Sequence, residues 1–214
     1  MPHTHSSPLP TAREAFRHLL ENDEFAGALR RAGTIIAGGN AALFGAYRTT
    51  HNPDNVESHI MTPRVPISQG VGAILRYCSL GRPLIGVFAG RPGQAETPIT
   101  PNPTELSYLP DIVGNRPLGI LGIVTLADPG LTVSAIMRSP HSTVTPQKRQ
   151  QQTQRRVASI ESVQPADALQ RHTLITEAGF RLVDFSFDGE GTLAQDPDPG
   201  IAALFRPQDA QTAP

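Results

Sequence analysis

The chain has 214 residues, which is long enough for one domain with a sizeable core. Its formal net charge is −1, so the composition gives no overall attraction to nucleic acid or to an anionic membrane. The single cysteine, Cys78, excludes an intramolecular disulfide and a cysteine-based metal site. The histidines show no metal-binding spacing, and no apolar run approaches the roughly 20 residues that span a bilayer. We therefore expect neither a bound metal nor a membrane partner.

The N-terminal part predicts a tail, a helix and a short strand. Residues 1–10 form a Ser-, His- and Pro-containing tail without the basic and apolar regions of a Sec signal peptide, and we expect it to be disordered. Thr11 and Glu14 form a capping box that begins a helix, which has a possible break near Asn22-Asp23 and which Gly33 can end. Residues 34–37 are then a short strand candidate.

The middle of the chain predicts alternating short strands and helices. Asn52 can cap a helix that has Pro53 at its first position. The expected elements, in order, are a strand at Leu43–Thr49, a helix at Asn52–His59, an extended stretch at Val65–Ser68, a helix at Val71–Ser79 and a strand at Leu84–Phe88.

The C-terminal part predicts a hairpin and one further helix–strand unit. Strands at 118–126 and 131–137 flank a turn at Asp128-Pro129-Gly130. Residues 139–156 are polar and charged and indicate an exposed linker, before a helix at 166–178 and a strand at 180–187. We expect one α+β domain over residues 11–194, with a loose Pro- and Asp-rich tail at 195–214.

Two side chains carry candidate chemistry. Arg48 follows an apolar strand, and a guanidinium at a strand end offers a planar fork to phosphate oxygens. Glu105 follows a Pro-rich loop, and a carboxylate in a cleft can stabilise an oxocarbenium-like centre. The competing interpretations are a solvated surface arginine and a glutamate that begins a helix.

Two other patterns are weaker candidates. Gly38-Gly39-Asn40 could cradle a phosphate, but its spacing fits neither the dinucleotide fingerprint nor the P-loop and favours a plain turn. Cys78, His141 and Asp184 could be drawn as a catalytic triad. Cys78 lies in the expected buried stripe of its helix, which favours a core cysteine.

Three ordered segments also carry a likeness to a known family. They are Tyr47-Arg48 with Pro53-Asp54, Val56 and Ile60–Arg64; Val65–Ser68 before a helix and the strand at 84–88; and Glu105-Leu106-Ser107 with Leu109, Ile112 and Leu118-Gly119. Over about residues 40–125 the chain resembles the cholera-toxin-like mono-ADP-ribosyltransferases, which include the heat-labile enterotoxin A chain. Arg48-Thr49-Thr50 is also similar to a strand of type III effectors of related fold.

The resemblance implies a split β-sandwich of two small sheets with flanking helices, and NAD as substrate. It implies that Arg48, with Tyr47 beside it, holds NAD through its phosphates, and that Ser68 braces the site. Glu105 would be the catalytic glutamate that stabilises the oxocarbenium transition state. A side chain of a host or other target protein would then attack the anomeric carbon.

The chain departs from the family at positions that matter. Pro66 and Ile67 occupy the first two positions of the Ser-Thr-Ser motif, and Pro103 stands where arginine-modifying members have Glu or Gln. These departures leave open another acceptor, simple NAD hydrolysis or an inactive scaffold. The first hypothesis is an NAD-dependent mono-ADP-ribosyltransferase-like bacterial effector, exported without a Sec signal to act in the target-cell cytoplasm, or otherwise cytoplasmic. The second is a non-enzymatic protein-binding module that acts by occupying a partner.

Overall fold

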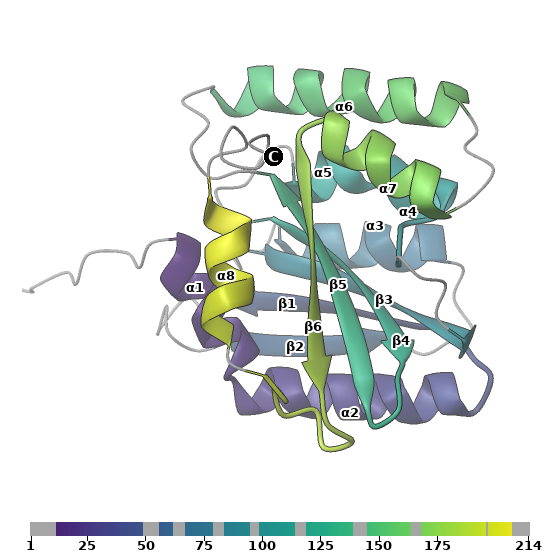
Figure 1. The fold of residues 1–214 in the computed structure, drawn as a ribbon, viewed down its shortest axis with the longest axis vertical. Helices are drawn as coiled ribbons and strands as arrows, with labels where there is room; N and C mark the ends of the chain where they lie inside the picture. Colours follow the sequence, from purple (N-terminus) through teal and green to yellow (C-terminus); the bar gives the residue numbers. More distant parts are fainter. Residues whose placement is uncertain are drawn as a thin grey trace, which may run out of the picture.

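The computed structural model describes residues 12–48, 56–61, 67–78, 84–94, 99–113, 119–138, 145–163, 168–195 and 197–206. These residues form three layers, with helices on both faces of a twisted sheet (Figure 1). The helices are α1 Ala12–Leu20, α2 Asp23–Ala37, α3 Ile67–Cys78, α4 Pro103–Ser107, α5 Leu109–Val113, α6 Pro146–Val163, α7 Ala168–Glu177 and α8 Pro197–Phe205. The strands are β1 Ala42–Arg48, β2 Val56–Met61, β3 Leu84–Gln94, β4 Ile120–Leu126, β5 Leu131–Arg138 and β6 Phe180–Phe187.

The described strands form one six-stranded sheet in the order β2-β1-β3-β4-β5-β6. The central pair, β3 and β4, is parallel, and every other neighbouring pair is antiparallel. The α+β class is therefore confirmed. The expected pair of small sheets is not what these strands form, because the hydrogen-bonded pairing of β3 with β4 joins both halves into one continuous sheet.

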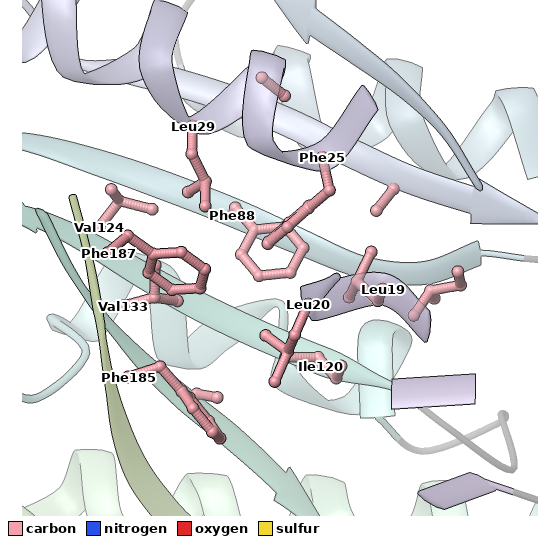
Figure 2. Close-up of a cluster of buried hydrophobic side chains, with 14 of the residues drawn as sticks. Leu19, Leu20, Phe25, Leu29, Phe88, Ile120, Val124, Val133, Phe185 and Phe187 are labelled. Atoms are coloured by element: carbon pink, nitrogen blue, oxygen red, sulfur yellow. The ribbon is translucent and has the colours of Figure 1, made fainter. Parts of the chain in front are cut away.

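The first face of the sheet is the side covered by α1, α2 and α8, and its core is rich in aromatic rings (Figure 2). Phe25 of α2 lies beside Phe88 of β3 with ring centroids 4.9 Å apart, and Phe44 stacks on Phe88 at 5.0 Å. Phe16 of α1 meets Phe185 of β6 edge to face at 5.4 Å. Because rings in these offset arrangements bury large areas, this face forms a dense apolar core.

Helix α2 is longer than its sequence suggested. Residues 34–37 form its last turn and not a strand, because Ile36 continues the buried stripe of the helix at the spacing of three to four residues. Gly33 lies inside the helix and does not end it. The absence of a side chain at Gly33 allows the helix to pack closely on the sheet, because an added Cβ would lie 3.2 Å from Leu131. The helix ends at Gly38, whose N–H donates to the carbonyl of Thr34.

Residues 197–205 correct the expected loose C-terminal tail. They form α8, which buries Ile201 and Leu204 completely against the first face. Arg17 of α1 forms an ion pair with Asp198 at the start of α8. Apolar burial holds this helix in place, a contribution that its Pro- and Asp-rich composition obscured. The expected tail at 1–10 lies outside the described residues.

The second face is covered by α3, α4, α5, α6 and α7. Residues 146–163 form α6, in which Thr153 and Val157 are buried, so the expected linker at 139–156 is a helix from Pro146 onward, although most of its other described side chains are exposed as expected. The sequence pattern did not predict this helix because few residues of α6 are apolar. The expected helix at 52–59 is wrong from Val56 onward, where β2 pairs antiparallel with β1.

Several expectations from local patterns are confirmed. β1, β3 and β6 lie where apolar or alternating residues predicted strands, although β3 continues to Gln94, past its expected end at Phe88, and α7 lies where a helix was expected. β4 and β5 form the predicted hairpin. Gly130 adopts φ +95° in its turn, where a Cβ would come within 2.1 Å of the carbonyl oxygen of Phe187. A glycine is needed there for both reasons.

Candidate functional site

The most distinctive polar feature of the second face is an ion pair between Arg91 and Glu105. Arg91 Nε donates to Glu105 Oε1 at 2.9 Å, and Arg91 Nη2 donates to the other carboxylate oxygen. Val87, Ala89 and Arg91 alternate along β3 toward this face. The pair therefore ties the end of β3 to the first turn of α4 through two parallel hydrogen bonds.

Local sequence explains why Glu105 stands there. Asn102 is the N-cap of α4, and its side-chain oxygen accepts a hydrogen bond from the Glu105 N–H at 2.9 Å. The Asn102 N–H in turn donates to Glu105 Oε2 at 2.8 Å, which completes a capping box. Pro103 occupies the first helical position, where a missing N–H costs nothing. The proline that departs from the transferase pattern thus has a structural role.

Burial makes this carboxylate part of the fold. Glu105 is 2% exposed, whereas the Arg91 side chain is 25% exposed. Both oxygens of Glu105 accept from donors within the chain, namely the Arg91 guanidinium and the Asn102 N–H. A buried carboxylate is tolerated only when it is paired and hydrogen-bonded in this way. To bond a ribose hydroxyl, Glu105 would have to give up at least one of these contacts.

Two further polar contacts lie on the same face. Arg171 of α7 donates from Nε to the hydroxyl of Thr100 at 3.0 Å. Ser134 of β5 donates to the carbonyl oxygen of Ile99 at 3.3 Å. Together with the ion pair, these bonds fasten the segment that leads into α4 to β3, β5 and α7. We call Arg91, Thr100, Glu105, Ser134 and Arg171 the polar cluster.

Tyr47, expected beside the cofactor, is a core residue. It is 1% exposed and belongs to the apolar cluster of the second face. Its hydroxyl donates to the carbonyl oxygen of Ile74 in α3 at 3.2 Å. Gly45 leaves room for this ring, because a Cβ there would lie 2.7 Å from the Tyr47 hydroxyl. The tyrosine therefore holds α3 against β1.

Arg48 and Ser68 are placed through their backbones only, since their side chains lie outside the described part. Arg48 is the last residue of β1 and pairs with Val56. Ser68 lies in the first turn of α3, and the expected extended stretch at 65–68 is wrong from Ile67 onward. Ile67 and Ser68 begin a helix whose Val71 and Ile74 are buried, and that packing outweighs any local strand preference.

The structure does not bring the backbone of Arg48 toward Glu105. In the antiparallel pair, Ala42 lies opposite Gly90, and Tyr47 lies opposite Leu84. β1 and β3 lie side by side (Figure 1). Arg48 therefore ends β1 beside the beginning of β3, while Arg91 stands near the other end of β3. Ala42 and Arg48, at the two ends of β1, are six residue steps apart, which is roughly 20 Å at about 3.4 Å per residue.

The glycine turn and the proposed triad, the two weaker candidates, show no sign of a site in the described residues. Gly38-Gly39-Asn40 follows the C-terminus of α2, with Gly39 at φ +79°, and so does not open a helix as a phosphate loop would. Cys78 is the last residue of α3 and Asp184 lies on β6, while His141 lies outside the described residues. Within the described ranges, no cluster of His, Cys, Asp and Glu could hold a metal ion. No helix in that part of the chain could cross a membrane.

A cavity of about 310 Å³ lies on the first face, between the α1–α2 junction and residues 191–195. Its polar lining includes the carboxylates of Glu21 and Asp23, and its apolar lining includes Leu20 and Leu193. Carboxylates at the rim repel a diphosphate. This cavity therefore suits NAD poorly, and it is separated from the polar cluster by the sheet.

Sequence reasoning identified Glu105 but missed its partner, Arg91. The capping signal was readable, because Asn102-Pro103-Thr104-Glu105 combines a good N-cap, a proline at the first position and a glutamate at the third. Arg91 gave no local signal, since it precedes Pro92 and Gly93 in a stretch without strand periodicity.

No model of a known protein family matches the chain, and a search of curated proteins likewise finds no match.

Proposed function

We propose that this chain is a non-enzymatic protein-binding module. The observation that carries the non-enzymatic part of this proposal is the full engagement of the Glu105 carboxylate by Arg91 and Asn102. A catalytic carboxylate has to face the reacting atoms of a substrate. Here its contacts connect β3 to α4, so its chemistry is that of a structural clamp.

The placement of the other expected site residues supports the same conclusion. Tyr47 is used in the core, and the end of β1 lies at the opposite end of β3 from the ion pair. An NAD molecule held by Arg48 would need its nicotinamide ribose to reach Glu105 across that separation. The Arg91–Glu105 pair would also have to open to admit it.

The second candidate is the NAD-dependent mono-ADP-ribosyltransferase, with NAD as substrate and a target protein as acceptor. It is favoured by the order of the Arg48, Ser68 and Glu105 segments along the sequence. In that case Glu105 would exchange Arg91 for the ribose, and Arg91 would be available to bind a phosphate. The catalytic site would then form on the single sheet of this chain, and not on the split sandwich of the toxins.

NAD turnover separates the two candidates. We expect the full chain to show no heat of NAD binding by calorimetry and neither nicotinamide release nor label transfer from NAD to protein. The variants for comparison are Arg48→Ala and Glu105→Gln, with Glu190→Gln as the matched control because its side chain is 75% exposed. Turnover that persists in Glu190→Gln and disappears in folded Glu105→Gln would overturn the non-enzymatic module. Label transfer to protein would then establish the transferase, and nicotinamide release alone would indicate NAD hydrolysis.

A further inference from the structure

Helix α6 carries a strong local excess of positive charge. Over Pro146–Val163 the helix contains Lys148, Arg149, Arg155 and Arg156 and a single acidic residue, Glu161, although the whole chain has a net charge of −1. The rest of the chain is therefore negative overall. Because like charges repel, an accumulation of this kind does not stabilise the helix. Its presence therefore calls for a role other than folding.

The packing of α6 does not require these basic residues. The helix contacts α4, α5 and α7, and its buried side chains among those described include Thr153 and Val157. Arg138 of β5 adds a hydrogen bond to Gln152 at 2.8 Å. Figure 1 shows α6 as the outermost layer on the second face. Most of its circumference is left to solvent.

The exposed cations share one side of this helix. Lys148, Gln152, Arg155 and Arg156 follow one another at intervals of four, three and one residues and are exposed. At a rise of about 1.5 Å per residue they span roughly 12 Å. Among the described residues, no carboxylate forms an ion pair with Lys148, Arg155 or Arg156. We call Lys148, Gln152, Arg155 and Arg156 together the basic face.

We propose that the basic face is the docking surface for an acidic segment of a partner protein, an inference that rests on the proposed binding function. Two adjacent arginines offer planar forks to carboxylates, and Gln152 adds a neutral hydrogen-bonding group between them and Lys148. The partner segment presents carboxylates about two helical turns apart, matching the interval from Lys148 to Arg155.

The surroundings favour a protein over nucleic acid or membrane. α6 has no aromatic residue on which a base could stack, and the sequence pI is about 6.7, well below the basic values of nucleic-acid-binding domains. An interfacial membrane helix needs a broad apolar face opposite its charges. α6 instead presents glutamines around its exposed surface.

The test measures by fluorescence anisotropy whether the full chain binds a labelled helical peptide whose glutamates lie two turns apart. A single-stranded oligonucleotide of equal charge is the second probe. We expect salt-sensitive peptide binding that K148E/R155E/R156E weakens by at least about tenfold. The matched control, R13E/R31E/R206E, makes the same charge change on the first face at exposed positions and should retain binding.

Equal loss in the two triple variants would show a general charge effect and overturn the proposal. Tighter binding of the oligonucleotide than of the peptide would assign the basic face to nucleic acid and overturn it too, as would failure to bind the peptide. The result is independent of NAD. If NAD turnover were found while peptide binding depended on the basic face, the docking surface would stand and only the non-enzymatic function would fail.

Discussion

The two faces of the sheet hold the same strands in different ways. On the first face, α1, α2 and α8 pack through rings that include Phe25, Phe44 and Phe88. On the second face, aliphatic packing is combined with the Arg91–Glu105 pair and the other polar bonds of the polar cluster. Apolar burial is strong and non-directional, whereas hydrogen bonds specify geometry.

Both faces contribute apolar burial to the free energy of unfolding, but they differ in what else they do. The second face fixes the path of the chain from β3 into α4 and carries α6 outward to solvent. Changes on the first face should therefore act through stability alone, while changes on the second face should also reveal what the molecule binds.

The largest effect is expected for Phe88→Ala. Phe88 is 1% exposed and contacts two other rings, so its truncation leaves a cavity in the first face. The free energy of unfolding should fall by about 4 kcal/mol, measured by urea denaturation. Phe88→Leu, which keeps most of the volume, should cost less than half as much. Equal losses in the two variants would contradict a cavity as the cause.

Glu105→Ala should come next. It leaves the Arg91 guanidinium without its carboxylate and removes the acceptor for the Asn102 N–H, at a cost of about 3 kcal/mol in urea denaturation. Arg91→Ala and the double variant complete a mutant cycle. A coupling free energy below about 0.5 kcal/mol would mean that the pair does not clamp β3 to α4.

Asn102→Ala should have a smaller effect. It removes the side-chain acceptor for the Glu105 N–H but leaves the ion pair in place, and loss of an N-cap costs about 1 kcal/mol. Asn102→Ser keeps an uncharged acceptor at the N-cap and should be nearly neutral in the same urea assay. A loss as large as that of Glu105→Ala would show that capping, and not the ion pair, dominates the polar cluster.

The smallest effect on stability is expected for K148E/R155E/R156E. These side chains are exposed, so the free energy of unfolding should change by no more than about 0.5 kcal/mol in urea. Combined with the expected loss of peptide binding, this result would separate the basic face from the structural parts of the second face. A loss of several kcal/mol would instead make α6 a structural helix that needs its charges.

Local sequence was sufficient where the signal is short-range. Alternating or apolar residues predicted β1, β3 and β6, and the turn at Asp128-Pro129-Gly130 predicted the β4–β5 hairpin. These features depend on side-chain periodicity and on the φ angles that glycine and proline permit. The cap of α4 is of the same kind, since its partners are three residues apart.

Tertiary structure decided what depends on distant partners. Ile35-Ile36 favour a strand by propensity, yet they lie in the last turn of α2 because Ile36 packs into the first face. Arg91 and Glu105 come together only because β3 and α4 fold onto one another. Propensity and capping act between neighbours in the chain, but burial and ion pairing act between residues that only folding brings together. For that reason local sequence was enough to single out Glu105 as a candidate, whereas the contacts of its carboxylate depend on the fold.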